Sequence, residues 1–283
     1  MLPITRETKR LIILVIFLLS LILLGTALYL FLRPAPTCLD GKQNQDETGT
    51  DCGGSCPAVC VIPVQGDPLT VPEVAFVSDG ANRYDILARV TNPNPFIGAS
   101  QFRYVLTLQD ATGADLAHES GTSWILPHET KTLLALGMTV TAPPVKATIE
   151  ITNVVWQELA GYQEAPALRI YDKRFVPISS GVNFAEVTGV LVNESAFDLR
   201  KVLIRAVLRD AGGKPVAVHQ TQMSTLTVNA REEFHLIWPN AFTGTVSQME
   251  IEADSNMYNQ ENFLKRYQPE GRFQDFRAAP SQF

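Results

Sequence analysis

Four cysteines are the residues of this chain best suited to covalent or metal chemistry. They lie within 23 residues, at Cys38, Cys52, Cys56 and Cys60, and the rest of the sequence has none. In an oxidising compartment such cysteines form disulfides by default, and four of them allow three pairings that sequence cannot distinguish. Zinc is the alternative, but structural zinc sites usually pair C-x₂₋₄-C elements, and this segment spaces its last three cysteines as C-x₃-C-x₃-C. We predict two intramolecular disulfides.

Acidic and amide side chains lie between the cysteines, where they could bind a metal. Asp40, Asn44, Glu47 and Asp51 supply oxygen atoms of the kind that calcium prefers, and neighbouring glycines permit tight turns. The spacing differs from the EF-hand pattern. The alternative is an acidic, solvated turn whose Asp and Asn side chains cap backbone amides. Calcium binding and amide capping both stay open, and no other cofactor is expected.

A long apolar segment before the cysteines decides where the rest of the chain resides. Residues 11–32 contain no charged side chain, and a helix of this length spans the roughly 30 Å hydrocarbon core of a bilayer. Arg6, Lys9 and Arg10 precede it and only Arg33 follows closely, which places the N-terminus in the cytoplasm by the positive-inside rule. A cleaved secretory signal, the alternative, has a shorter apolar region and an A-x-A-like cleavage site. We predict cytoplasmic residues 1–10, an uncleaved transmembrane signal anchor at 11–32, and an extracytoplasmic remainder at the cell surface or in the periplasm.

The cysteine-rich segment at residues 33–69 is predicted to be a stapled spacer, since so small a fragment cannot build a hydrophobic core. It resembles a recurring module of exported and surface proteins with the pattern C-x-D-G-x-x-N-x-x-E-x-x-x-D-C-G-G-x-C-x-x-C. The matching positions are Cys38, Asp40, Gly41, Asn44, Glu47, Asp51, Cys52, Gly53, Gly54 and Cys56. The last spacing, before Cys60, is one residue longer. The resemblance implies surface exposure and no particular activity.

The remaining sequence repeats itself. Residues 84–92 align with residues 185–193 at an offset of 101, and residues 106–113 align with residues 206–213 at an offset of 100. A period near 100 residues corresponds to a sandwich-sized domain rather than to a solenoid unit. We therefore predict two tandem domains, at residues 70–160 and 161–260, with their boundary near residues 159–166. Because this connector is short, we expect the domains to stack end to end.

Apolar and polar side chains alternate within each copy. The apolar positions of two such runs are Phe102, Tyr104, Leu106 and Leu108 in the first copy, and Val202, Ile204, Ala206 and Leu208 in the second. The outward positions of the second run are Lys201, Arg205 and Arg209. A period of two with one polar face indicates antiparallel sheets half exposed to water. Asp110 and Asp210 each begin a turn that ends in glycine, as in β-hairpins. We predict an all-β fold of two immunoglobulin- or fibronectin-like sandwiches with seven strands each.

The two copies resemble the FxLYD and LEA14-like (water-stress) group of small β-sandwich domains. Residues 106–110 and 206–210 occupy the F-x-L-Y-D position and keep its Leu and Asp without its aromatic residues. Residues 91–95, Thr-Asn-Pro-Asn-Pro, resemble the Asn-Pro turn of the group, and residues 192–194 are a weaker counterpart. The resemblance covers most of residues 70–260 and implies extracytoplasmic binding or structural modules, often tethered to membranes, without catalytic residues. Immunoglobulin domains proper would carry a Cys…Trp…Cys set, which this region lacks.

The sequence offers little support for catalysis or for nucleic-acid binding. Its net charge is −6, its pI is near 5.3, and its basic residues are scattered rather than clustered. The histidines form no H-x-x-x-H or H-E-x-x-H pair and are interpreted as surface residues: His118, His128, His219 and His235. Nothing near Ser120 supplies both a base and the group that would orient it, as a serine nucleophile requires. The tryptophans fall in strand-like surroundings and are predicted to pack in the core, with an exposed glycan- or peptide-binding strip as the alternative: Trp124, Trp156 and Trp238. No enzymatic activity is expected.

Two apolar segments are candidates for partner binding. The loop at residues 92–98 holds Phe96 and Ile97 between prolines and a glycine, so that ordering them on binding would cost little entropy. The alternative is that one of them folds inward and plugs the end of the sandwich, which the presence of Phe197 near the same place of the second copy favours. The tail at residues 261–283 loses the alternation, and we expect it to fray, although it could pack back on the second domain or bind a partner.

These observations lead to two functional hypotheses. The first is a membrane-anchored extracytoplasmic binding or adhesion module without catalytic activity, whose partner is a protein or another cell-surface component. The second is a structural or accessory subunit of a cell-envelope complex of the secretion or pilus type. A third, binding of an apolar ligand between the sheets, follows only from the LEA14-like resemblance. The sequence does not identify the partner.

Overall fold

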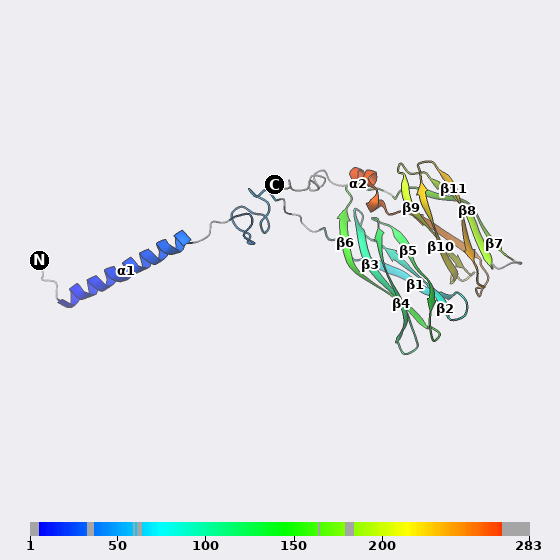
Figure 1. Ribbon diagram of the computed structural model, residues 1–283, viewed down its shortest axis with the longest axis horizontal. Coiled ribbons are helices and arrows are strands. Elements are labelled where there is room, and N and C mark those ends of the chain that lie inside the picture. The colour runs from blue at the N-terminus through cyan, green and yellow to red at the C-terminus, as the bar shows by residue number, and fades with distance from the viewer. Residues whose placement is uncertain are drawn as a thin grey trace, which may run out of the picture. The chain divides into compact units, whose positions relative to one another are not determined.

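The computed structural model describes residues 6–32, 37–58, 60, 64–163, 165–178 and 184–267. The chain divides into two compact units, one within residues 1–62 and the other within residues 63–283. The first contains the apolar helix and the cysteine-rich segment. The second contains both β-domains, coloured from cyan to red in Figure 1.

Helix α1 (Arg6–Leu32) is apolar over nearly its whole length. Its stretch Lys9–Tyr29 has a mean hydropathy of 3.1 and is long enough to cross a membrane. The side chains described in it are exposed on every face, as is usual for a helix that meets lipid rather than a protein core. The helix begins before the predicted residue 11, because charged residues such as Lys9 and Arg10 continue its first turns.

The first β-domain consists of six antiparallel strands in two sheets of order β1-β2-β5 and β4-β3-β6. Its strands are β1 (Thr70–Ser78), β2 (Arg83–Thr91), β3 (Ile97–Gln109), β4 (Asp115–Ile125), β5 (Thr130–Thr139) and β6 (Lys146–Glu158). The second domain repeats this plan as β11-β8-β7 and β10-β9-β12. Its strands are β7 (Leu168–Pro177), β8 (Ala185–Asn193), β9 (Leu199–Arg209), β10 (Pro215–Leu226), β11 (Arg231–Trp238) and β12 (Gln248–Asp254). We call β1–β6 the first copy and β7–β12 the second copy.

The all-β sandwich class is therefore confirmed, whereas the prediction of seven strands per copy is wrong. Each copy has six strands among the residues that the structure describes. The segment from β5 to β6, residues 140–145, is too short to hold another strand. The alternation of β3 and β9 is confirmed, since Phe102, Leu106, Ile204 and Leu208 are completely buried in the cores of their own copies.

Equivalent buried side chains build the same turns in both copies. Asn92 Nδ2 donates to the carbonyls of Ile97 and Leu126, and Asn193 Nδ2 donates to those of Phe197 and Leu226. A buried amide that bridges two carbonyls satisfies loop groups which water cannot reach. The Asn of the Asn-Pro turn is therefore a structural residue of the fold.

The hairpin turns that begin at Asp110 and Asp210 are confirmed. Each Asp Oδ1 accepts hydrogen bonds from the backbone N–H groups two and four residues later. Each turn contains a glycine with positive φ, Gly113 at +84° and Gly213 at +80°, a conformation that glycine adopts without a steric penalty.

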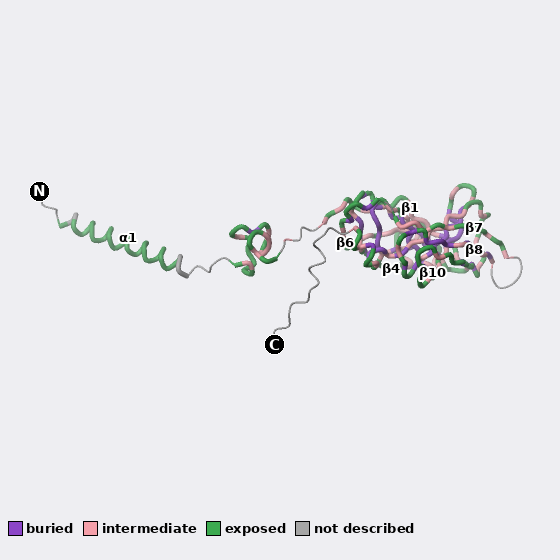
Figure 2. Tube along the Cα trace, turned by 90° about the horizontal axis from the view of Figure 1, so that it is seen from above, coloured by how far each residue is buried: buried purple, intermediate pink, exposed green. Residues whose placement is uncertain are grey.

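The two copies pack face to face, so the predicted end-to-end stack is wrong. Sheet β1-β2-β5 of the first copy lies against sheet β10-β9-β12 of the second, which places four sheets side by side in Figure 1. Apolar residues of both copies meet at this interface, among them Leu87, Leu134, Val207 and Val218. Figure 2 shows buried positions concentrated within this part of the chain.

The polar face predicted for β9 is correct in direction but is not wholly exposed to water. Arg205 and Arg209 point out of their own sandwich, yet the first copy covers them and each is 6% exposed, whereas Lys201 remains exposed. Arg209 donates two hydrogen bonds to Glu73 of β1, at 2.7 and 2.8 Å, and a third to Glu250 of β12. Arg89 of β2 pairs in turn with Glu250. The bonds to Glu73 and from Arg89 to Glu250 join the two copies, with a buried Arg209 and partly buried partners, and their charge-assisted character makes them the stronger kind of hydrogen bond.

The segment that follows β12 fills the junction between the copies. It forms a short helix η1 (Met257–Asn259) and helix α2 (Glu261–Tyr267). Phe263 of α2 is completely buried and contacts Phe197, and the hydroxyl of Tyr258 in η1 donates to the Ile125 carbonyl of the first copy. The prediction that the tail frays is therefore wrong for residues 261–267, because the aromatic side chain of Phe263 packs in the apolar core. Residues 268–283 lie outside the described part of the chain.

Candidate ligand-binding site

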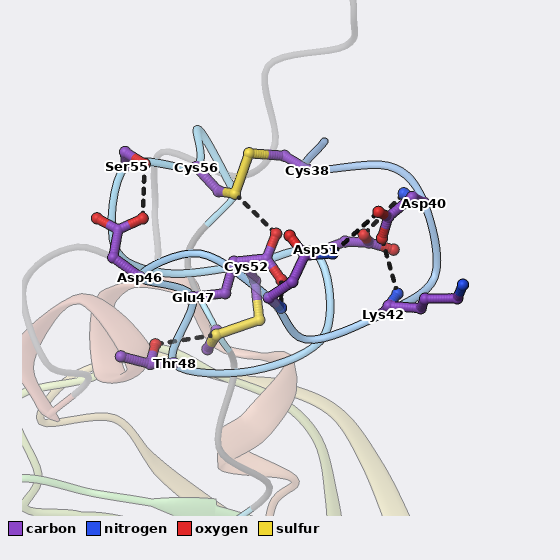
Figure 3. The surroundings of a disulfide bond; sticks show 12 residues. Cys38, Asp40, Lys42, Asp46, Glu47, Thr48, Asp51, Cys52, Ser55 and Cys56 are labelled. Carbon is purple, nitrogen blue, oxygen red and sulfur yellow. Dashed lines mark hydrogen bonds between the residues drawn. A yellow bond between two sulfur atoms is a disulfide. The ribbon is translucent and has the colours of Figure 1, made fainter. Parts of the chain in front are cut away.

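The cysteine-rich segment contains two disulfides, Cys38–Cys56 and Cys52–Cys60, as Figure 3 shows. This outcome confirms the predicted oxidised state and selects one of the three pairings. A carboxylate oxygen of Glu47 and the sulfurs of Cys38 and Cys56 lie close enough together to be metal ligands, but both sulfurs belong to a disulfide and carry no thiolate. Because a thiolate is the form that binds metals, this group is not a zinc site.

The four residues considered for calcium lie close together and bind mainly backbone amides. Both oxygens of Asp51 accept from the Gly41 N–H, and one also accepts from that of Asp40. Glu47 is buried and accepts from the Asn44 N–H at 3.0 Å. A hydrogen bond from the Asn44 side chain lowers the pKa of Asp40. These contacts, drawn in Figure 3, are those of the capping alternative.

The two residues considered for partner binding differ in exposure. The Phe96 ring is 53% exposed, while Ile97 begins β3 and is half-buried. Phe96 is thus not the plug of its sandwich end. In the second copy, Phe197 is partly buried because Phe263 of α2 covers it. The end of the first copy therefore presents an exposed aromatic ring where the second copy does not.

A cleft between the two copies has a volume of about 580 Å³ and a largely polar lining. Strand β9 contributes Arg200, Lys201 and Arg205, and β3 and β4 of the first copy contribute Tyr104 and Trp124. Amide side chains from η1 and its flanks complete the lining: Asn256, Asn259 and Gln260. Such a mixture of guanidinium, amide and aromatic groups can orient a polar ligand by hydrogen bonds while an aromatic surface supports it.

Local backbone geometry positions these cleft residues. Gly121 of β4 lies opposite Tyr104 of β3, and a Cβ at this glycine would lie 2.5 Å from the Tyr104 phenol, so only glycine lets the ring cross it. Burial raises the pKa of Tyr104, which keeps the phenol protonated as a hydrogen-bond donor. Lys201 has a φ of +57° and lies in the left-handed region that side chains other than glycine rarely adopt. Such strained residues often occur at binding sites.

Sequence patterns alone did not identify this cleft. Arg205 reads as one more outward residue of a strand, and Asn259 belongs to a segment without alternation. Only the packing of one copy on the other brings them together. The expectation that the tryptophans pack in the core is borne out for Trp124 and Trp238, which are buried, and Trp156 is half-buried.

Comparison with known proteins gives no family. No family model matches the sequence, and no curated protein matches it. Among solved structures, the chain is similar to the red sea bream transglutaminase, with 11% sequence identity and a TM-score of 0.22. The similarity covers 69% of this chain and only 29% of the transglutaminase. A likeness of this kind supports no argument about fold or activity.

Proposed function

We propose that this chain is a membrane-anchored, extracytoplasmic binding module that recognises a carbohydrate in the cleft between its two β-domains. The apolar helix supplies the anchor, and the disulfides indicate an oxidising compartment. The basic residues Arg6, Lys9 and Arg10 before the apolar stretch favour a cytoplasmic N-terminus. The observation that carries the proposal is the polar cleft of about 580 Å³, whose size suits a short oligosaccharide.

The chemistry of the lining favours a carbohydrate over an apolar ligand. Hydroxyl groups both donate and accept hydrogen bonds, so they match the amides of Asn259 and Gln260 and the guanidinium of Arg200. Tyr104 offers a partly buried aromatic surface against which a sugar ring can pack. The apolar interiors of the sandwiches, by contrast, are filled by side chains such as Phe102 and Leu191. Binding rather than turnover is therefore the proposed role.

A panel of immobilised oligosaccharides tests the cleft. The full chain, purified in detergent, should bind at least one of them, and Arg200→Ala should lose that binding. Arg231→Ala is the matched control, because Arg231 is an exposed arginine that begins β11, on the other sheet of the same copy. Equal binding by both variants, or no binding to any oligosaccharide by the wild-type chain, would overturn the proposal.

The membrane topology is tested separately. A protease added to intact cells should remove both β-domains and leave a small membrane-bound stub. A soluble protein that begins near residue 35 and accumulates in the medium would instead show a cleaved signal peptide.

The alternative, an accessory subunit of a cell-envelope complex, is favoured by the rigid packing of the two copies. The ion pair between Arg209 and Glu73 joins the two copies and would hold them in a fixed orientation, as a scaffold requires. Chemical cross-linking in intact cells separates the two functions. Recovery of a defined protein complex that persists in Arg200→Ala supports the scaffold, whereas loss of capture in that variant supports the cleft.

A further inference from the structure

A second cluster of chemically reactive side chains lies at the interface between the copies. Lys131 on β5 is 1% exposed, and its Nζ lies 3.6 Å from Asp254 Oδ2 and 3.7 Å from Glu129 Oε1. Arg205 Nη1 donates to the same Asp254 oxygen at 2.5 Å. Lys131 and Glu129 belong to the first copy, and Asp254 and Arg205 to the second. An amine and a carboxyl group therefore face each other across the interface, with the nitrogen 3.6 Å from one oxygen of the carboxyl group that it would attack.

The hydrogen bonds of this cluster are incomplete. Lys131 Nζ and Asp254 Oδ1 are both buried, and neither has a hydrogen-bond partner among the residues that the structure describes. Buried polar atoms of this kind are uncommon, and each requires a physical explanation. Trp124 covers the Lys131 amine with the face of its ring and shields it from water. An ion pair alone would leave these two atoms unsatisfied, whereas a covalent bond between the two side chains would remove the unsatisfied oxygen.

We propose that Lys131 and Asp254 condense into an intramolecular isopeptide bond that joins the two copies, with Glu129 as the group that transfers protons. The Nζ of the neutral amine attacks Cγ of Asp254 and forms the new C–N bond. Oδ1 leaves as water, taking one proton from Nζ and one from the Glu129 carboxyl. Glu129 ends as a carboxylate, so atoms and charge balance without an oxidant or any other reactant.

The neighbouring groups suit these roles. The Leu126 backbone N–H donates to Glu129 Oε2 at 2.6 Å, which leaves Oε1 to carry the proton beside Lys131. Arg205 holds Oδ2, the oxygen that remains as the amide carbonyl, and can stabilise its negative charge during the attack. Burial lowers the pKa of the Lys131 amine and raises the pKa of Glu129. Both directions favour a neutral amine beside a protonated acid. Burial would raise the pKa of Asp254, but the neighbouring Lys131 and Arg205 lower it, so Asp254 starts as a carboxylate and its Oδ1 must take up both protons before it leaves as water.

Removal of water from the site favours the amide product. The condensation is unfavourable in bulk water, but at a buried site the two groups are already oriented and the water released can leave. A cavity of about 420 Å³, lined by Glu129, Lys131 and Asp254 among others, offers that exit. The reaction occurs once per chain and modifies the chain itself, so it does not make the protein an enzyme for external substrates.

The intact mass of the full chain, purified in detergent and with its disulfides reduced, tests the proposal. The wild type should be lighter than its sequence by one water molecule, and protease digestion should yield a branched peptide that contains Lys131 and Asp254. Asp40–Gly41 and Asp79–Gly80 can also lose water by succinimide formation, so Lys131→Arg is the matched control and should show the full mass. Glu129→Gln keeps the size of the side chain, lacks the transferable proton, and should also show the full mass.

Two results would overturn the proposal. A wild-type chain of full mass would mean that the cluster is held by ion pairs only. A branched peptide that joins Lys131 to Glu129 would refute the assignment to Asp254. Circular dichroism shows whether each variant is folded, and a folded Glu129→Gln chain that still loses water would remove Glu129 from its role.

Discussion

The buried carboxyl group of Asp85 should make the stability of the β-domains depend on pH. Asp85 lies on β2, is 5% exposed, and accepts a hydrogen bond from the Gly137 N–H at 2.7 Å. Burial raises its pKa from 3.8 to about 6. Because the folded state holds the proton more tightly than the unfolded state, the stability that this group contributes is complete below pH 4 and is lost as the pH rises through about 6.

The pKa shift sets the size of the effect. A rise of the pKa from 3.8 to about 6 corresponds to about 3 kcal/mol, at about 1.4 kcal/mol per pH unit. Asp85→Asn keeps the oxygen that accepts from Gly137 and can carry no charge. The variant should therefore have nearly wild-type stability at pH 4 and exceed the wild type by as much as about 3 kcal/mol at pH 8.

Urea denaturation followed by tryptophan fluorescence measures this difference, because all three tryptophans lie in the β-domains. Other titrating groups, such as His219, are common to both proteins and cancel in the difference between them. Asp110→Asn is the control, and its stability relative to the wild type should change with pH in the opposite direction. The reason is that a hydrogen bond from Thr112 lowers the pKa of this exposed carboxylate. A stability difference for Asp85→Asn that is constant between pH 4 and pH 8 would refute the reasoning.

Three further predictions concern the interface and the cysteines. Arg209→Ala should lower the free energy of unfolding by about 2 kcal/mol, since it removes the buried guanidinium that donates to Glu73 and Glu250 and leaves only Arg89 to pair with them. Arg103→Ala at an exposed site of β3 should change it by less than about 0.5 kcal/mol. Gly98→Ala should lower the melting temperature, because its Cβ would lie 1.8 Å from the Tyr258 hydroxyl, and adding Tyr258→Phe should restore part of the loss. Reduction of the two disulfides should leave the melting transition of the β-domains nearly unchanged, as both bonds lie in the other unit; a large shift would contradict this independence.

Local patterns predicted the elements of this fold better than their assembly. Alternation placed Ile204 and Leu208 in a core and directed Arg205 and Arg209 away from it, and both results hold. A period of two, however, states only which way a side chain points. Whether the polar face then meets water or another sheet depends on Glu73, which lies 136 residues from Arg209.

The candidate sites could not be predicted from the sequence either, because their residues come together only when the two copies pack. Lys131 stands between two threonines, as an ordinary exposed strand residue would, and its partner Asp254 lies in the other copy. The cysteines show the opposite case. Their oxidation could be predicted because four cysteines lie close together in the sequence, in a segment expected to face an oxidising compartment. Which cysteines pair depends on the turns that the Asp51 carboxylate stabilises, and the sequence does not show these turns.

The contact between the copies joins unlike faces of the same fold. Sheet β1-β2-β5 corresponds to β7-β8-β11 in the second copy, yet it packs on β10-β9-β12, the counterpart of β4-β3-β6. A contact between unlike faces does not close on itself, so each end of the pair displays a face of the type that is buried in the middle. Repeated contacts of this kind would join many molecules into an open filament.

The two outer faces carry different side chains from the faces that meet at the internal contact. At the offsets of the repeat, Arg209 corresponds to Gln109 and Arg89 to Val190. Glu73 pairs with Arg89 in the register of β1 and β2, and Tyr171 takes the equivalent place opposite Val190 in β7 and β8. The outer faces thus lack the arginines that bind across the internal contact, and one of them has a tyrosine where its counterpart has the Glu73 carboxylate. The ion pairs of the internal contact therefore cannot form again at either outer face, which disfavours the addition of further copies through the same contact.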